Sequence, residues 1–94
     1  MVITVVDNVA AQRFEATVDG QLCVLEYRID GNSMVLRHTE GPAALSGRGI
    51  AAALTKYAMD SARERGMDVV PKCAYAAAWI KRHPEYADLM RAGS

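Results

Sequence analysis

The pattern of hydrophobic and polar positions makes the first part of the chain typical of β-structure. A short β-branched run is followed by three segments in which hydrophobic and polar residues alternate, at 2–6, 13–18, 21–29 and 33–39. Asp19-Gly20 stands between the second and third segments, and this dipeptide is typical of a tight hairpin turn. Asp30-Gly31-Asn32 turns the chain again before the fourth. The pattern predicts an antiparallel meander of three or four strands.

The second part of the chain has helical spacing. A stripe that begins at Ile50 repeats every three to four residues and includes Ile50, Leu54, Tyr57, Ala58 and Ser61. Gly66 is a natural helix stop, and a short apolar strand over 67–70 ends at Pro71. Residues 74–82 form an alanine-rich helix with Trp79 and Ile80 as its large apolar side chains, and Pro84 begins a last helical turn. The predicted fold class is α+β, with one mixed sheet and helices packed on it.

The 94 residues provide for one domain over 1–94, with 11 basic and 11 acidic side chains and a formal net charge of zero. This balance gives no general reason to bind nucleic acid or an anionic membrane. No apolar run approaches a membrane span, and the first residues do not form a secretory signal, so we expect a cytoplasmic protein. The chain has two cysteines, two histidines and no CxxC pair, so no metal site is predicted.

The glycine-containing segment 46–51 stands between a strand and a helix and is the most informative stretch for chemistry. Glycines let backbone N–H groups turn toward one point, and the first turn of the helix adds free N–H groups and partial positive charge. Such a segment suits phosphate or pyrophosphate. The alternative is a connector that lets the helix pack closely on the sheet. Neither GxxxxGK[ST] nor GxGxxG is present, which excludes those nucleotide-binding loops.

The chain resembles compact, single-domain members of the GNAT superfamily of acetyl-coenzyme A-dependent N-acetyltransferases. The segments that carry the resemblance are Arg13-Phe14-Glu15, Tyr27, His38-Thr39-Glu40, Gly47-Arg48-Gly49-Ile50-Ala51, Pro71-Lys72-Cys73-Ala74-Tyr75 and His83-Pro84-Glu85-Tyr86. They span nearly the whole chain in the order that the short subgroup shows.

The resemblance implies a GNAT-like fold and acetyl-coenzyme A as cofactor. It assigns the pyrophosphate to Leu45, Ser46, Gly47, Arg48, Gly49, Ile50 and Ala51. It places the pantetheine arm beside the strand that holds Arg37, His38 and Thr39. The strand ending at Val70 is expected to diverge from that strand and leave a slot for the thioester, which Cys73 would line.

Three side chains are candidates for catalysis. Cys73 is expected at the start of a helix beside Lys72, a setting that favours the thiolate, so it is either an acetyl-accepting nucleophile or part of the pocket wall. His38 is the best-placed base, with Glu40 second, and Tyr75 could protonate the departing thiolate. Each has a structural alternative: Cys73 as a small buried residue, His38 as a packing residue that alternates with Met34 and Leu36, and Tyr75 as a core residue.

The sequence therefore favours an N-acetyltransferase that acts on a small-molecule or protein amine, whose identity the sequence does not specify. A non-catalytic module that binds coenzyme A or acyl-coenzyme A is the alternative. A small α+β interaction domain is a third possibility.

Overall fold

A computed structural model describes residues 3–41 and 49–90 of the chain, and their order of elements is the one that the hydrophobic pattern predicts. The elements are β1 (Val5–Asn8), β2 (Arg13–Val18), β3 (Gln21–Asp30), β4 (Ser33–Glu40), α1 (Ile50–Glu64), β5 (Asp68–Pro71), α2 (Ala74–Lys81) and the 3-10 helix η2 (Pro84–Leu89). The α+β class is thus confirmed. The first strand begins at Val5, later than the run that predicted it.

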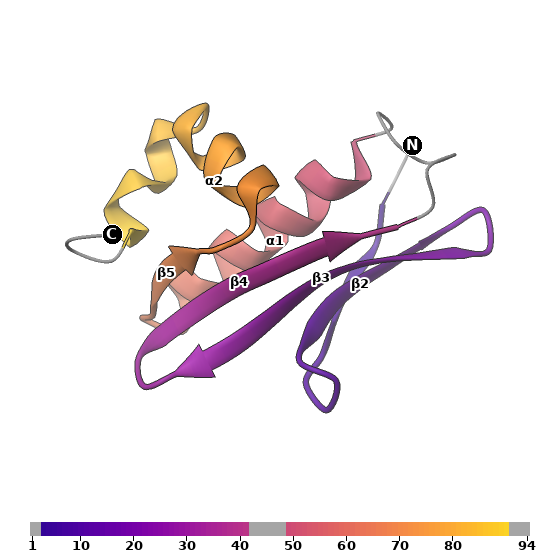
Figure 1. The fold of residues 1–94 in the computed structure, drawn as a ribbon, viewed down its shortest axis with the longest axis horizontal. Helices are drawn as coiled ribbons and strands as arrows, with labels where there is room; N and C mark the ends of the chain where they lie inside the picture. Colours follow the sequence, from indigo (N-terminus) through magenta and orange to yellow (C-terminus); the bar gives the residue numbers. More distant parts are fainter. Residues whose placement is uncertain (1–2, 42–48, 91–94) are drawn as a thin grey trace.

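The strands form one five-stranded sheet in the order β1-β2-β3-β4-β5. The first four pair antiparallel as a meander, and β5 pairs parallel with β4. Because a parallel neighbour needs a crossover, α1 carries the chain from β4 back to the start of β5. Figure 1 shows α1 behind the strands, and α2 with η2 beside the β5 edge.

The core lies between one face of this sheet and the helices. It is built from side chains that alternate along the strands together with the inner faces of α1 and α2, and its largest fully buried members are Phe14, Leu25, Met34, Leu36, Leu54, Met59 and Val69. No helix of the described ranges covers the other face of the sheet, which we call the open face. No helix within 3–41 and 49–90 is long and apolar enough to span a membrane.

The buried side of α1 differs from the stripe that the sequence predicts. Ile50, Leu54 and Ala58 are buried as expected, but Tyr57 is 41% exposed. The buried surface instead extends to Thr55, Met59 and Ala62. Thr55 is accommodated there because its hydroxyl donates to the Ala51 carbonyl oxygen at 2.8 Å.

A β-bulge between β3 and β4 changes which residues of β4 face the helices. Tyr27 lies opposite Leu36, whereas the preceding residue of β3 lies opposite His38, so Arg37 is the extra residue of β4. Strict alternation would place His38 on the same face as Leu36. The bulge instead gives that place to Thr39 and turns His38 toward the open face. The interpretation of His38 as a packing residue in line with Met34 and Leu36 is therefore wrong.

Tyr27 joins three elements through its hydroxyl. The ring is buried beside Phe14, with centroids 4.7 Å apart, and the Oη atom donates to Asp7 Oδ1 at 2.6 Å. Asp7 Oδ2 lies 3.5 Å from Arg65 Nη2, beyond the end of α1. Burial, followed by the hydrogen bond to Asp7, raises the pKa of Tyr27 to about 12.

Replacing Tyr27 by phenylalanine should lower the free energy of unfolding at pH 8 by about 1.5 to 3 kcal/mol, because a hydrogen bond to a carboxylate is lost. Since the raised pKa favours the neutral phenol in the folded state, the contribution of Tyr27 is complete below pH 10 and declines as the pH rises through about 12. Urea unfolding of both proteins from pH 8 to 12 measures the difference. A gap that stays constant over this range would contradict the assigned role.

Candidate active site

The central feature of the site is the point where β4 and β5 separate, which we call the fork. Parallel pairing ends at Leu36 and Pro71. Beyond this point β4 continues through Glu40, whereas the segment after β5 turns into α2. The Leu36 carbonyl oxygen accepts hydrogen bonds from the N–H groups of Lys72 and Cys73, both at 2.9 Å. Beyond Leu36, β5 no longer pairs with β4, so the divergence that the resemblance implies is present.

Cys73 lies at the fork. It is the N-cap residue of α2, as expected from the sequence, and it is a free cysteine that is 8% exposed. Its Sγ atom lies 3.2 Å from Thr39 Oγ1, and either atom can be the donor. The bulge makes this contact possible because it directs Thr39, instead of His38, to the helix side of β4. The predicted site residues Cys73 and Thr39 are therefore brought together.

His38 and Arg37 lie elsewhere. Both are exposed, and the His38 side chain is 60% exposed with its Nε2 atom 3.9 Å from Glu40 Oε2. The structure does not place His38 beside Cys73. It forms instead a loose pair with the carboxylate that was the second candidate for the base.

Tyr75 lies in the first turn of α2. It is half-buried and packs against the core, and its hydroxyl forms no hydrogen bond with any described residue. Its position two residues after Cys73 is compatible with either role that the sequence left open for it.

The N-terminus of α1 presents free backbone donors. Gly49 is its N-cap, with φ of 77°, a left-handed conformation that favours glycine. The N–H of Ala53 donates to the Gly49 carbonyl oxygen, so the N–H groups of Ile50, Ala51 and Ala52 precede the first intrahelical bond. Within the described part of the chain, no side chain caps this end and no acidic residue occupies the first turn. Leu45, Ser46, Gly47 and Arg48 of the predicted pyrophosphate segment lie outside the described residues.

The helices that support Cys73 are tied together by charged contacts. Burial alone would raise the pKa of Asp60, but hydrogen bonds from Lys56 and Tyr86 outweigh it and lower that pKa. Arg63 of α1 forms a bidentate hydrogen-bonded ion pair with Asp88, and these hydrogen bonds lower the pKa of the Asp88 carboxyl group. These contacts fix η2, and through it α2, against α1.

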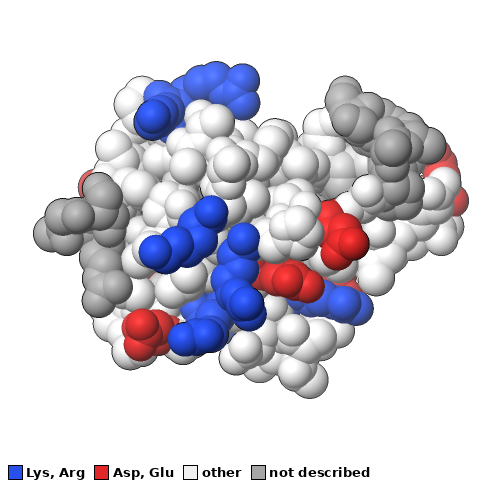
Figure 2. Space-filling view, in the orientation of Figure 1, with Lys and Arg blue, Asp and Glu red and all other residues white. Residues whose placement is uncertain are grey.

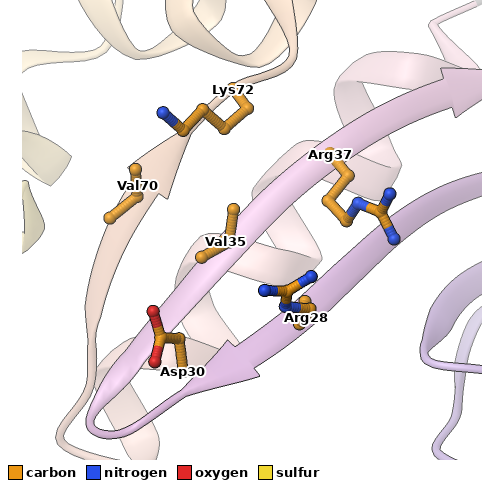
Figure 3. Close-up of a pocket in the computed structure, with 6 residues that line it drawn as sticks. All are labelled: Arg28, Asp30, Val35, Arg37, Val70 and Lys72. Atoms are coloured by element: carbon orange, nitrogen blue, oxygen red, sulfur yellow. The ribbon is translucent and has the colours of Figure 1, made fainter.

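A pocket on the open face lies beside the fork. The sequence did not predict it, although it singled out Arg37 and Lys72 for other roles. We call it the cationic pocket. It has a volume of about 440 Å³ and is lined by Arg28, Asp30, Val35, Arg37, Val70 and Lys72. Figure 3 shows Val35 and Val70 side by side on neighbouring strands, with the charged side chains around them. The residues come from β3, β4 and the end of β5, and only the sheet topology brings them together.

Comparisons with known proteins show the family of the chain. A family model described as GCN5-related N-acetyl-transferase matches residues 13–89, most of the chain. Protein NATD1 of Xenopus tropicalis is 42% identical over 62 residues, which are 65% of this chain and 57% of that protein. Protein NATD1 of Homo sapiens is 40% identical over 62 residues, 65% of this chain and 55% of that protein. The chain thus matches little more than half the length of these relatives.

A solved structure shares the fold. The solution structure of a GCN5-like protein from Staphylococcus aureus superposes with a TM-score of 0.74 at 22% sequence identity, over 97% of this chain and 90% of that one. The superposition shows a shared fold, and the family follows from the match of the family model to residues 13–89. The chain belongs to the GCN5-related N-acetyl-transferase family.

Proposed function

We propose that the protein transfers the acetyl group of acetyl-coenzyme A to an amine. The observation that carries this proposal is the fork, where β5 leaves β4, the β4 edge continues beyond it, and a thiol lies at the point of divergence. The family to which the chain belongs gives the reaction type, and the fork provides a place for it.

The backbone hydrogen-bonding groups of β4 and of the α1 N-terminus suit acetyl-coenzyme A. Backbone groups of β4 beyond Leu36 can pair with the amides of the pantetheine arm, because β5 does not occupy that edge. The free N–H groups of Ile50, Ala51 and Ala52 can bind the pyrophosphate, and no carboxylate in this turn opposes them. Gly49 supports this fit, since a side chain there would enter open space, with no described atom within 4 Å. When bound, the cofactor supplies an activated acetyl thioester.

Cys73 has two possible roles at the fork. Its thiol can act as a nucleophile that would exchange its proton for the acetyl group, so that coenzyme A leaves as the free thiol, while Thr39 Oγ1 orients the Sγ atom through a hydrogen bond. Alternatively, Cys73 can form the wall of the thioester pocket. In either case the acceptor must lose a proton. An amine with a pKa of about 10.4 is ~4.6 kcal/mol from its neutral form at pH 7, so a base has to assist it. Glu40 and His38, paired on the exposed end of β4, are our candidates.

One observation favours the alternative, a module that binds coenzyme A without turnover. Among the described residues, no histidine or carboxylate forms a hydrogen bond or ion pair with Cys73. A protein that kept the β4 edge and the α1 N-terminus but lacked a base would bind the cofactor and acetylate nothing.

Release of free thiol from acetyl-coenzyme A, measured with a broad panel of amines, separates the two functions. Amine-dependent release supports the transferase. Binding by calorimetry without release across the panel favours the module. If millimolar coenzyme A fails to raise the melting temperature, both are wrong, because a ligand that binds only the folded state must stabilise it.

A further inference from the structure

We propose that the cationic pocket binds an anionic group, a carboxylate or a phosphate, carried by the amine acceptor. The proposal rests on the proposed function, because it assigns the acceptor of that reaction to a chemical class.

The pocket combines an apolar floor with a charged rim. Val35 of β4 and Val70 of β5 are half-buried partners in the parallel ladder and form the floor. Arg28, Arg37 and Lys72 stand around it as three cations, with Asp30 as the one acidic lining residue (Figure 3). Its volume of about 440 Å³ lies within the range of small-molecule sites. An amine with a short aliphatic body and an anionic end matches such a surface.

The charges of the pocket are available for a ligand. Within the described part of the chain, Arg28, Arg37 and Lys72 form no ion pair or side-chain hydrogen bond. Arg13, Lys56, Arg63 and Arg65, by contrast, each contact a carboxylate. The net charge of the chain is zero, so this group of unpaired cations is a local feature of the surface and not part of an overall positive charge. Figure 2 shows basic side chains gathered near the middle of the open face, with acidic side chains beside them.

The pocket adjoins the fork through a single carbonyl group. Arg37 directly follows Leu36, and Lys72 directly precedes Cys73. Since the Leu36 carbonyl oxygen accepts from the N–H groups of both Lys72 and Cys73, these backbone segments are fixed to each other. An acceptor anchored by its anion in the pocket is therefore held next to the fork. The open face is also opposite to α1, whose N-terminus is assigned to the cofactor phosphates, so the two anionic groups would bind on different faces.

A neighbouring pocket on the sheet does not offer this chemistry. It is lined by Arg13, Leu22, Val24, Glu40 and Gly41. Its arginine is already engaged by Glu15, and Glu40 opposes an anion. The unpaired cations therefore favour the cationic pocket as the place for an anionic group.

Paired acceptors that differ by one anionic group test the proposal. Phosphoethanolamine is compared with ethanolamine, and β-alanine with propylamine, which separates a preference for phosphate from one for carboxylate. The variant Arg28→Gln should lower kcat/KM for the preferred anionic amine at least tenfold. The corresponding change for its partner amine without the anionic group should stay within twofold, and coenzyme A affinity should not change. The effect should weaken with added salt, because the contacts are exposed.

Arg82→Gln is the matched control, since it removes the same residue type from an exposed part of the chain outside the pocket. It should leave all values within twofold. An equal loss in the control, or equal losses for amines with and without the anionic group, would overturn the proposal. Loss of coenzyme A affinity in the pocket variant would also overturn it, because the pocket would then bind the cofactor.

A binding measurement keeps the pocket testable even if no amine is acetylated. With coenzyme A present, phosphoethanolamine or β-alanine should shift the methyl NMR signals of Val35 and Val70, and the partner amine without the anionic group should not. The shifts should disappear in Arg28→Gln. Shifts without turnover would reject the transferase function and retain the anion pocket. Turnover of anionic amines without these shifts would reject the pocket and retain the transferase.

Discussion

Replacing Gly49 by aspartate should weaken coenzyme A binding by about 100-fold, or ~2.7 kcal/mol. Gly49 is the N-cap of α1, and a side chain there meets no described atom within 4 Å, so a carboxylate can be accommodated without a steric clash. It would stand beside the free N–H groups that we assign to the pyrophosphate. Two like charges about 4 Å apart cost roughly 4 kcal/mol near a protein surface, and solvent exposure reduces this value.

Asparagine at the same position is the matched control. Aspartate and asparagine have nearly the same size, and both are among the non-glycine residues that best tolerate the left-handed conformation at Gly49. Both variants therefore carry the same cost of placing a side chain on a left-handed backbone. The difference between their affinities for coenzyme A reports the effect of the negative charge. Isothermal titration calorimetry with coenzyme A measures it. Equal affinities for Gly49→Asp and Gly49→Asn would show that the pyrophosphate lies elsewhere.

Replacing Cys73 by alanine should lower kcat for acetyl transfer by at least about 100-fold if the thiol carries the acetyl group, because no neighbouring nucleophile can replace it. Coenzyme A affinity should change less than threefold. The substitution removes one buried sulfur atom that contacts Thr39, so the loss of stability should stay near 1 kcal/mol. Steady-state kinetics and the melting temperature measure these two effects separately.

Cys23→Ala provides the control, since Cys23 is also a buried free cysteine but lies within β3. It should lose a similar amount of stability and keep full activity. Mass spectrometry after brief incubation with acetyl-coenzyme A should find one added acetyl group on the wild type and Cys23→Ala, and none on Cys73→Ala. Full activity of Cys73→Ala would rule out the covalent role and leave Cys73 as part of the pocket wall.

Local patterns predicted the elements well because each one is encoded by neighbouring residues. Asp19-Gly20 connects β2 to β3 with positive φ at both residues, and Gly66 follows α1 in a left-handed conformation, as the sequence indicates. The position of Cys73 at the start of α2 also follows locally, from Pro71 and the alanine-rich run. The buried side of α1 was predicted less well. The helical spacing placed Tyr57 on the buried side, but the exposure of Tyr57 depends on how α1 lies on the sheet.

The sequence by itself determined the α+β order, the glycine at the α1 N-terminus and a thiol at the start of α2, because turns, caps and periodicity depend on residues close in the chain. Only the tertiary structure decided which side chains meet. The extra residue at the β4 bulge shifts by one position the alternation of side chains between the two faces of the sheet. As a result, Thr39 contacts Cys73 and His38 faces away. The parallel pairing of β5 with β4 joins Lys72 to Arg37 and Arg28 in one pocket. Bulges and pairings between distant strands depend on long-range contacts, and a local pattern does not contain them.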